Sequence, residues 1–222
     1  MEGEFVIRFQ PLRATALAGV LGALTMFAGD MLFYGQWGSG ADVAANTYSI
    51  VAGTSPERLM LGGLLSMPAG LGYLGGALHV FQRLARAGWV LRTATTGAVL
   101  SVLIVAVATH AVWGAFALTV ASGSRAANAL VSHYLDQHFL IGQIIAVPAS
   151  LLLFGITVSG RTSWPRWVAV FNPGLVYLAL ATANWFPAPF GAAIVGGAFN
   201  LAFAVFFLVS LATARNEDSR DR

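Results

Sequence analysis

The chain has 222 residues, of which 57% are hydrophobic and only 9% are charged, so it is far more apolar than a typical soluble domain. This composition argues against a water-soluble fold and predicts an integral membrane protein. No cysteine is present, which excludes disulfides and thiolate-bound metals. The 12 basic residues are all arginine and give a net charge of +3, but they are scattered singly between apolar stretches. Nucleic acid, which needs a basic patch, is therefore not an expected partner.

Six apolar segments are each long enough to cross a hydrocarbon core of about 30 Å, which takes about 20 helical residues. We therefore expect an all-α integral membrane protein, a single bundle of about six transmembrane helices over residues 1–222. A polar segment at 1–13 and a polar, frayed tail at 214–222 would flank it. The expected spans are 14–36, 58–81, 91–121, 126–158, 164–185 and 188–213.

The arginines predict the orientation of this bundle. In a six-span chain only Arg58 and Arg125 fall on one side of the membrane, and the other ten fall on the opposite side. Because positive residues concentrate in cytoplasmic loops, both termini are expected to be cytoplasmic. The expected location is a bacterial cytoplasmic membrane, which the chain crosses several times. The first span is too long for the apolar part of a signal peptide, so we expect it to be retained.

One connection stands out by its length. Residues 36–56 link the first two spans on the non-cytoplasmic side, and we expect them to form a loop. Such a long loop is either a lid or binding loop, or a segment that lies on the surface. The sequence Ser55-Pro56-Glu57 predicts the start of the next helix, because serine caps, proline suits the first turn and glutamate complements the helix dipole.

A carboxylate stands near the end of the first span, in the stretch FAGDMLFYG at residues 27–35. Charge inside a bilayer is costly, so Asp30 is expected to face the protein interior. Tyr34 lies four residues further along and shares a helix face with Asp30, so its phenol is placed to donate to the carboxylate. Two interpretations stay open: Asp30 pairs with a histidine or arginine for structure, or it is a neutral acid that gives up a proton.

Histidines mark the third and fourth spans. His110 and Trp113 share one face in THAVWGAF, and His110 is a suitable partner for Asp30. In HYLDQH, His133 and Asp136 share a face, and a metal site with His110 is conceivable, but the spacing matches no zinc signature. We therefore expect no metal and no cofactor. His110 also fits a structural hydrogen bond between helices, with Trp113 at the membrane interface.

Because the outer halves of several spans carry polar side chains, we expect a shared pocket there. Asn172 precedes Pro173, whose missing N–H frees backbone groups that an amide can satisfy. Trp185 ends the fifth span and is expected at the same depth as Asp30. The expected catalytic residues are Asp30, Glu57 and His110, and the expected substrate-binding residues are Tyr34, Trp113, His133, Asp136, Trp185 and Asn172.

Three short stretches stand out in the first three spans: Gly29-Asp30, Pro56-Glu57-Arg58-Leu59 and His110. They resemble a little-characterised family of multi-helix bacterial membrane proteins. Size, helix count and the intramembrane carboxylate are also similar to bacterial membrane-bound terpene cyclases that act on prenylated precursors. No aspartate-rich, diphosphate-ionising motif is visible, so the resemblance implies protonation-initiated chemistry and not ionisation of a diphosphate.

On that resemblance, an acid protonates a prenyl chain, aromatic rings stabilise the cation and a base removes the final proton. The implied roles are acid for Asp30, tuning for Tyr34 or His110, second acid or relay for Glu57, and cation walls for Trp113 and Trp185. The expected partners are a lipid-like or prenylated small molecule and membrane lipids. Three alternatives stay open: a lipid or sterol-like isomerase, a small transporter, and a bundle that binds lipid or protein without catalysis. The oligomeric state is not predicted.

Overall fold

The computed structural model describes residues 11–35, 38–188 and 190–218, and these fold into helices with no strand. The α-helices are α1 (Pro11–Tyr34), α2 (Gly40–Ala52), α3 (Pro56–Leu64), α4 (Ser66–Arg83), α5 (Trp89–Ala121), α6 (Arg125–Val158), α7 (Pro173–Ala181), α8 (Gly191–Gly196) and α9 (Ala198–Asp218). The 3₁₀ helices are η1 (Ala85–Ala87) and η2 (Arg166–Phe171).

Within the described residues, four helices are long and apolar enough to cross a membrane: α1, the continuous pair α3 and α4, α5, and α6. This makes the chain a multi-pass membrane protein by length and composition. The two spans predicted nearest the C-terminus correspond to shorter pieces. Residues 164–185 are divided into η2 and α7 at Asn172, because Pro173 has no N–H to continue the helix. Residues 188–213 are divided into α8 and α9 at Gly197.

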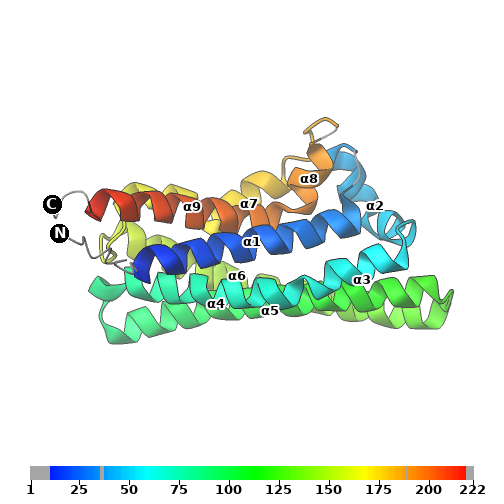
Figure 1. Ribbon diagram of the computed structural model, residues 1–222, viewed down its shortest axis with the longest axis horizontal. Coiled ribbons are helices and arrows are strands. Elements are labelled where there is room, and N and C mark those ends of the chain that lie inside the picture. Colours follow the sequence, from blue (N-terminus) through cyan, green and yellow to red (C-terminus); the bar gives the residue numbers. More distant parts are fainter. Residues whose placement is uncertain (1–10, 36–37, 189, 219–222) are drawn as a thin grey trace, which may run out of the picture.

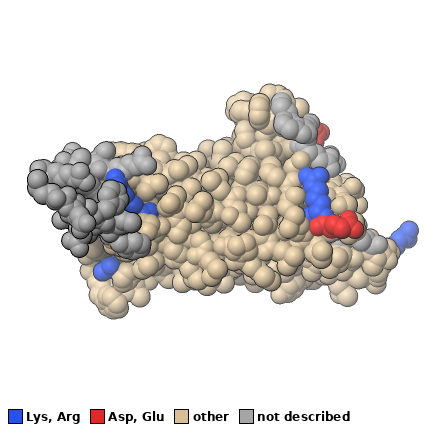
Figure 2. Space-filling view, in the orientation of Figure 1, with Lys and Arg blue, Asp and Glu red and all other residues tan. Residues whose placement is uncertain are grey.

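The long helices run parallel or antiparallel to one another (Figure 1). Helix α1 packs between α4 and α9, while α5 and α6 form a long antiparallel hairpin. We call the end at which α1 begins and α9 ends the terminal end, and the opposite end, which holds α2, the distal end. On the face shown in Figure 2, charged side chains lie towards the two ends, and a broad uncharged stretch separates them. That distribution suits a bundle embedded in lipid.

Small residues allow the first and fourth helices to touch backbone to backbone. A Cβ added at Gly72 would lie 2.5 Å from the Cα of Gly22, closer than real Cβ contacts come. Membrane helices rely on such close packing, because lipid tails leave little hydrophobic drive between helices. The position of Asp30, two turns beyond Gly22, is therefore fixed by tight contact of α1 with α4.

The prediction of a loop over residues 36–56 is wrong for most of that segment, because Gly40–Ala52 form α2. The Ser39 hydroxyl accepts a hydrogen bond from the Asp42 N–H at 3.2 Å, and the Asp42 carboxylate accepts one from the Ser39 N–H at 2.9 Å. This reciprocal cap satisfies two N–H groups at the start of the helix. Hydrogen bonds from Ser39 also lower the pKa of Asp42. Residues 36 and 37 lie outside the described residues.

Both described chain ends are helical over more residues than predicted. Helix α9 continues to Asp218, so it extends into the segment predicted as a frayed tail. Adding residues to an existing helix gains a hydrogen bond for each residue fixed, which favours this extension over a new start. At the other terminus α1 includes Pro11, which was predicted to lie in the polar segment 1–13. Residues 1–10 and 219–222 lie outside the described residues.

Candidate functional site

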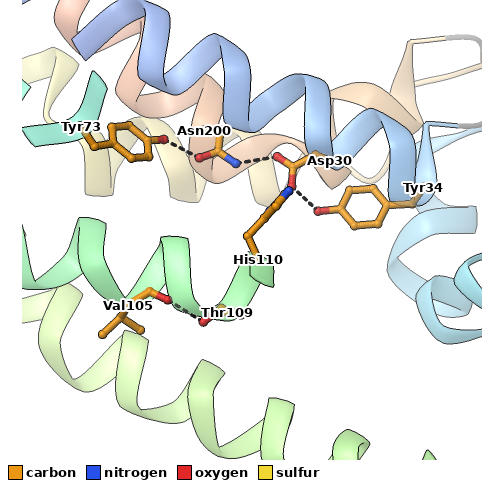
Figure 3. Close-up of polar contacts among 7 residues, drawn as sticks. All are labelled: Asp30, Tyr34, Tyr73, Val105, Thr109, His110 and Asn200. Atoms are coloured by element: carbon orange, nitrogen blue, oxygen red, sulfur yellow. Dashed lines mark hydrogen bonds and ion pairs between the residues drawn. The ribbon is translucent and has the colours of Figure 1, made fainter. Parts of the chain in front are cut away.

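Asp30 is buried in the distal half of the bundle, with 4% of its surface exposed. Both carboxyl oxygens accept hydrogen bonds from other side chains. The Tyr34 hydroxyl donates to Oδ1 at 2.8 Å, which confirms the contact expected from their spacing on α1. The Asn200 amide, on α9, donates to Oδ2 at 2.6 Å (Figure 3). The carboxyl group is therefore held on both sides by uncharged donors.

A second tyrosine fixes the orientation of that amide. The Tyr73 hydroxyl, on α4, donates to Asn200 Oδ1 at 2.5 Å (Figure 3). Because the amide oxygen accepts from Tyr73, the amide nitrogen is turned towards Asp30. Tyr73 and Asn200 are both buried, and neither lines the cavity described below. Tyr73 and Asn200 therefore hold the carboxyl group in place without bordering the cavity.

His110 faces the same carboxyl group from α5. Its Nδ1 lies 3.5 Å from Asp30 Oδ1, and its ring packs on Phe33 with the ring centroids 4.7 Å apart. A Cβ added at Gly29 would lie 2.4 Å from His110 Nε2, so only glycine at that position leaves room for the imidazole. Asp30 and His110 can share one proton, either as a neutral pair or as an ion pair. The pair is an acid and a base side by side.

A cavity of about 410 Å³ begins at this pair, a volume typical of small-molecule sites. It follows α5 from Val99 to Trp113, which is 14 residues or about 21 Å of helix. We call its distal part the acid lobe, lined by Asp30, Tyr34, His110 and Trp113. We call the part nearer the terminal end the apolar lobe, lined by Val99, Val102, Ala149, Leu153 and Phe203.

Aromatic rings line much of the cavity. Trp113 is 5% exposed and stands one helical turn from His110. Phe199 and Phe203 of α9 lie with their ring centroids 5.1 Å apart. Ring faces attract positive charge, so such walls can stabilise a cation that has no polar partner. The aromatic lining residues are Tyr34, Trp113, Phe139, Tyr177, Phe199 and Phe203.

Four predicted site residues lie away from the cavity. Glu57, His133 and Asp136 are exposed, and Trp185 is 75% exposed. None of them is among the residues that line the cavity. Their depth was inferred from hydropathy, but His133 and Asp136 lie on an outward face of α6, and Trp185 lies beyond the end of α7. Glu57 lies in the first turn of α3 behind the Ser55 cap and Pro56, as expected from the sequence.

Asn172 is buried but holds the backbone at a helix start. Its Oδ1 accepts from the Ser150 hydroxyl at 2.5 Å and from the Gly174 N–H at 3.0 Å. Its amide nitrogen donates to the Ser150 carbonyl at 3.1 Å. These bonds cap α7 and join it to α6. Its neighbours Ser150, Pro173 and Gly174 line the cavity, but Asn172 itself does not.

Several residues that line the cavity were not among the site residues predicted from the sequence. His138 lines the cavity, and its Nδ1 lies 3.4 Å from the Thr109 hydroxyl. The signal for this face was present in α6, where His138, Gly142 and Ala146 repeat at intervals of four residues. Small residues in such a stripe leave space beside a helix. Asn200 gave no comparable signal, because it lies 170 residues from Asp30.

A second buried polar cluster, the His79–Arg83 cluster, lies near the terminal end. Arg83 is fully buried, and its Nη2 donates to the Ser210 carbonyl and the Thr213 hydroxyl, each at 3.1 Å. The Ser210 hydroxyl lies 2.5 Å from His79 Nε2 and accepts from Trp164 Nε1 at 2.5 Å. His79 is also completely buried. None of the five lines the cavity.

These features define a helical membrane protein with an interior acid–base pair on an apolar cavity. The chain belongs to DUF6796, a family of unknown function whose model matches residues 9–217. No curated protein and no solved structure matches the chain. Among the residues that the structure describes, no three histidine, cysteine, aspartate or glutamate side chains are grouped as metal ligands.

Proposed function

We propose that the protein is a membrane-embedded enzyme that performs acid–base chemistry on an apolar, prenyl-type substrate, most simply a cyclisation started by protonation. The observation that carries the proposal is the contact between Asp30 and His110 on the wall of an otherwise apolar cavity. A polar pair in the hydrocarbon layer is costly unless it is used or fully enclosed. Here the pair is held by Tyr34 and Asn200 but borders open space.

The reaction needs one proton and returns it. Asp30 transfers its carboxyl proton to a carbon of the terminal double bond, whose π pair forms the new C–H bond and leaves a tertiary cation. A neighbouring double bond donates its π pair to that cation and closes a ring. His110 then accepts a proton from the carbon beside the final cation, and the C–H pair becomes the new double bond. The proton passes back to Asp30 across the 3.5 Å contact.

Neighbouring groups support each step. The hydroxyl of Tyr34 and the amide of Asn200 both point hydrogens at the carboxyl group, so they stabilise the carboxylate that remains after protonation. Trp113 stands beside the pair, where its ring face can stabilise the first cation. The reaction needs no oxidant or reductant, because substrate and product are isomers.

We further propose that the bundle crosses a bacterial cytoplasmic membrane six times with both termini in the cytoplasm. The division of the arginines, ten against two, supports this orientation. So does the position of the described chain ends, since α1 begins and α9 ends at the same end of the bundle (Figure 1). The pieces α7 and α8–α9 would then complete the fifth and sixth crossings. The Asp30–His110 pair would lie in the outer half of the membrane.

A double-bond isomerase of lipid or sterol-like substrates is the second candidate. It is favoured by the closeness of acid and base, because a double-bond shift needs a proton added and another removed along one short path. The two candidates differ in their products. A cyclase removes one double bond for each ring formed, whereas an isomerase keeps the number of double bonds.

The test is Asp30→Asn, which keeps the shape of the side chain but has no proton to release. Membranes with each variant receive prenylated indole, quinone-like and sterol-like substrates, and products are separated by mass and retention time. We expect turnover to fall by a factor of roughly 100 or more, the typical contribution of a general acid. Glu57→Gln, at an exposed acid of the same end, should keep full turnover. Equal activity of Asp30→Asn and the native chain would reject the assignment.

A further inference from the structure

The cavity reaches the surface of the bundle between α6 and α7. Three residues both line the cavity and are exposed: Phe139 at 45% and Gln143 on α6, and Tyr177 at 38% on α7. A side chain that has both properties marks the place where internal space meets the surroundings. We call these three residues the mouth.

The mouth lies at the depth of the hydrocarbon layer. Gln143 is 18 residues from the start of α6 and 15 from its end, or about 27 Å and 22 Å along the helix. Exposed neighbours on the same helix are apolar, including Leu140, Ile144 and Val147. With a hydrocarbon core of about 30 Å, both ends of α6 reach its boundaries and the mouth faces lipid tails.

The chemistry of the mouth restricts what can pass. Two aromatic rings and one amide form it, and none of these three side chains carries a charge. A diphosphate or carboxylate would find no charged partner there and would lose its hydration. A neutral molecule with a prenyl chain is already dissolved in the adjacent lipid. Its weakly polar head can bond the Gln143 amide.

We propose that the substrate is a neutral, prenyl-bearing lipid that enters sideways from the bilayer through the mouth, with its head at Gln143 and its chain in the cavity. This inference rests on the proposed function for the reaction that follows, but not for the entry route. Such entry needs no opening of the site to either aqueous side of the membrane. The molecule crosses no aqueous compartment, because the bilayer itself delivers it.

The entry route is tested by blocking it. Ala146 lines the cavity one turn from Gln143, so Ala146→Trp places a large ring at the entrance. Val147→Trp is the matched control, because Val147 is the next residue, 59% exposed, and is not a lining residue. Each variant is reconstituted in vesicles with a farnesyl aryl ether that carries a diazirine on its chain. Cross-linked peptides are then identified after illumination.

We expect the native chain and Val147→Trp to be labelled on lining residues of α5 and α6. Labelling of Ala146→Trp should fall by about tenfold or more, since a well-packed site does not admit an extra ring and a chain together. Unchanged labelling of Ala146→Trp would overturn the entry route. So would equal labelling by a farnesyl diphosphate probe of the same design, which would show that charge is no barrier.

A second measurement does not depend on the folding of a bulky variant. The chain has no cysteine, so Gln143→Cys carries a single fluorophore at the mouth. We expect quenching by doxyl groups in the middle of lipid tails and no quenching by aqueous iodide. Iodide quenching would overturn the proposal. Asp30→Asn should keep normal labelling, so loss of turnover with intact labelling concerns only the chemistry.

Discussion

Two clusters of buried polar side chains occupy this bundle, and they differ in what surrounds them. The His79–Arg83 cluster near the terminal end is enclosed by protein, and none of its members lines the cavity. The cluster around Asp30 is buried to a similar degree, yet Asp30 and His110 border open space. Both clusters bond side chains across several helices. The degree of burial therefore does not distinguish a structural cluster from a functional one in this bundle, whereas contact with the cavity does.

Their hydrogen bonds show the same contrast. Around Arg83, donors meet hydroxyl and carbonyl acceptors, and Ser210 of α9 is bonded to side chains of α4 and to Trp164, which precedes η2. Around Asp30, Tyr34 and Asn200 each donate to one carboxyl oxygen, while His110 Nδ1 lies 3.5 Å from Oδ1, longer than an ordinary hydrogen bond. The first cluster is suited to holding the helices together, whereas in the second a proton can move between Asp30 and His110. Mutations in the first cluster should therefore lower stability, and mutations in the second should lower turnover.

The largest effect on stability is expected from Arg83→Met. Removal of the guanidinium takes away its hydrogen bonds to the Ser210 carbonyl and the Thr213 hydroxyl inside the bundle, which should cost about 2 to 4 kcal/mol. Unfolding in mixed micelles measures this loss, with Arg86→Met as the control at an exposed arginine. Turnover per folded molecule should stay unchanged. A stable variant with impaired chemistry would break the distinction between the clusters.

Gly29→Ala should have an effect of intermediate size, and this effect should be on turnover and not on stability. The added Cβ would collide with His110 Nε2, so the ring must move away from Asp30. We expect turnover to fall by a factor of roughly 10 to 100, because misplacing a catalytic group by about 1 Å is already damaging. Gly97→Ala is the control, since a Cβ there meets nothing within 4 Å. Full activity of Gly29→Ala would show that the contact with His110 is not needed.

The smallest effects are expected from removing one hydroxyl or one indole N–H. Tyr34→Phe loses a donor to Asp30, and Trp164→Phe loses a donor to Ser210. Tyr34→Phe should raise the barrier to reaction by about 1 kcal/mol. Trp164→Phe should lower the free energy of unfolding by about the same amount. Turnover and micelle unfolding measured on both variants check the assignment. Loss of stability in Tyr34→Phe together with loss of turnover in Trp164→Phe would reverse the roles given to the two clusters.

The sequence alone determined the helical class and the axial position of the important side chains. Long apolar runs leave a membrane helix as the stable state, because backbone groups in lipid must bond within the segment. Spacing by four residues placed Asp30 and Tyr34 on one face of α1, and the structure confirms their hydrogen bond. His110 was named as a partner for Asp30, and the two lie 3.5 Å apart. These relations depend on helix geometry and depth.

Only the tertiary structure decided which side of each helix faces the interior. His133 and His138 occupy the same stretch of α6, yet His133 is exposed and His138 lines the cavity. Hydropathy gives depth in the membrane but not rotation about the helix axis, which is set by packing against neighbours. The bond from Asn200 to Asp30 likewise needs α9 to lie beside α1. That contact depends on how Gly, Ala and Phe residues of the two helices pack together, which no local sequence pattern predicts.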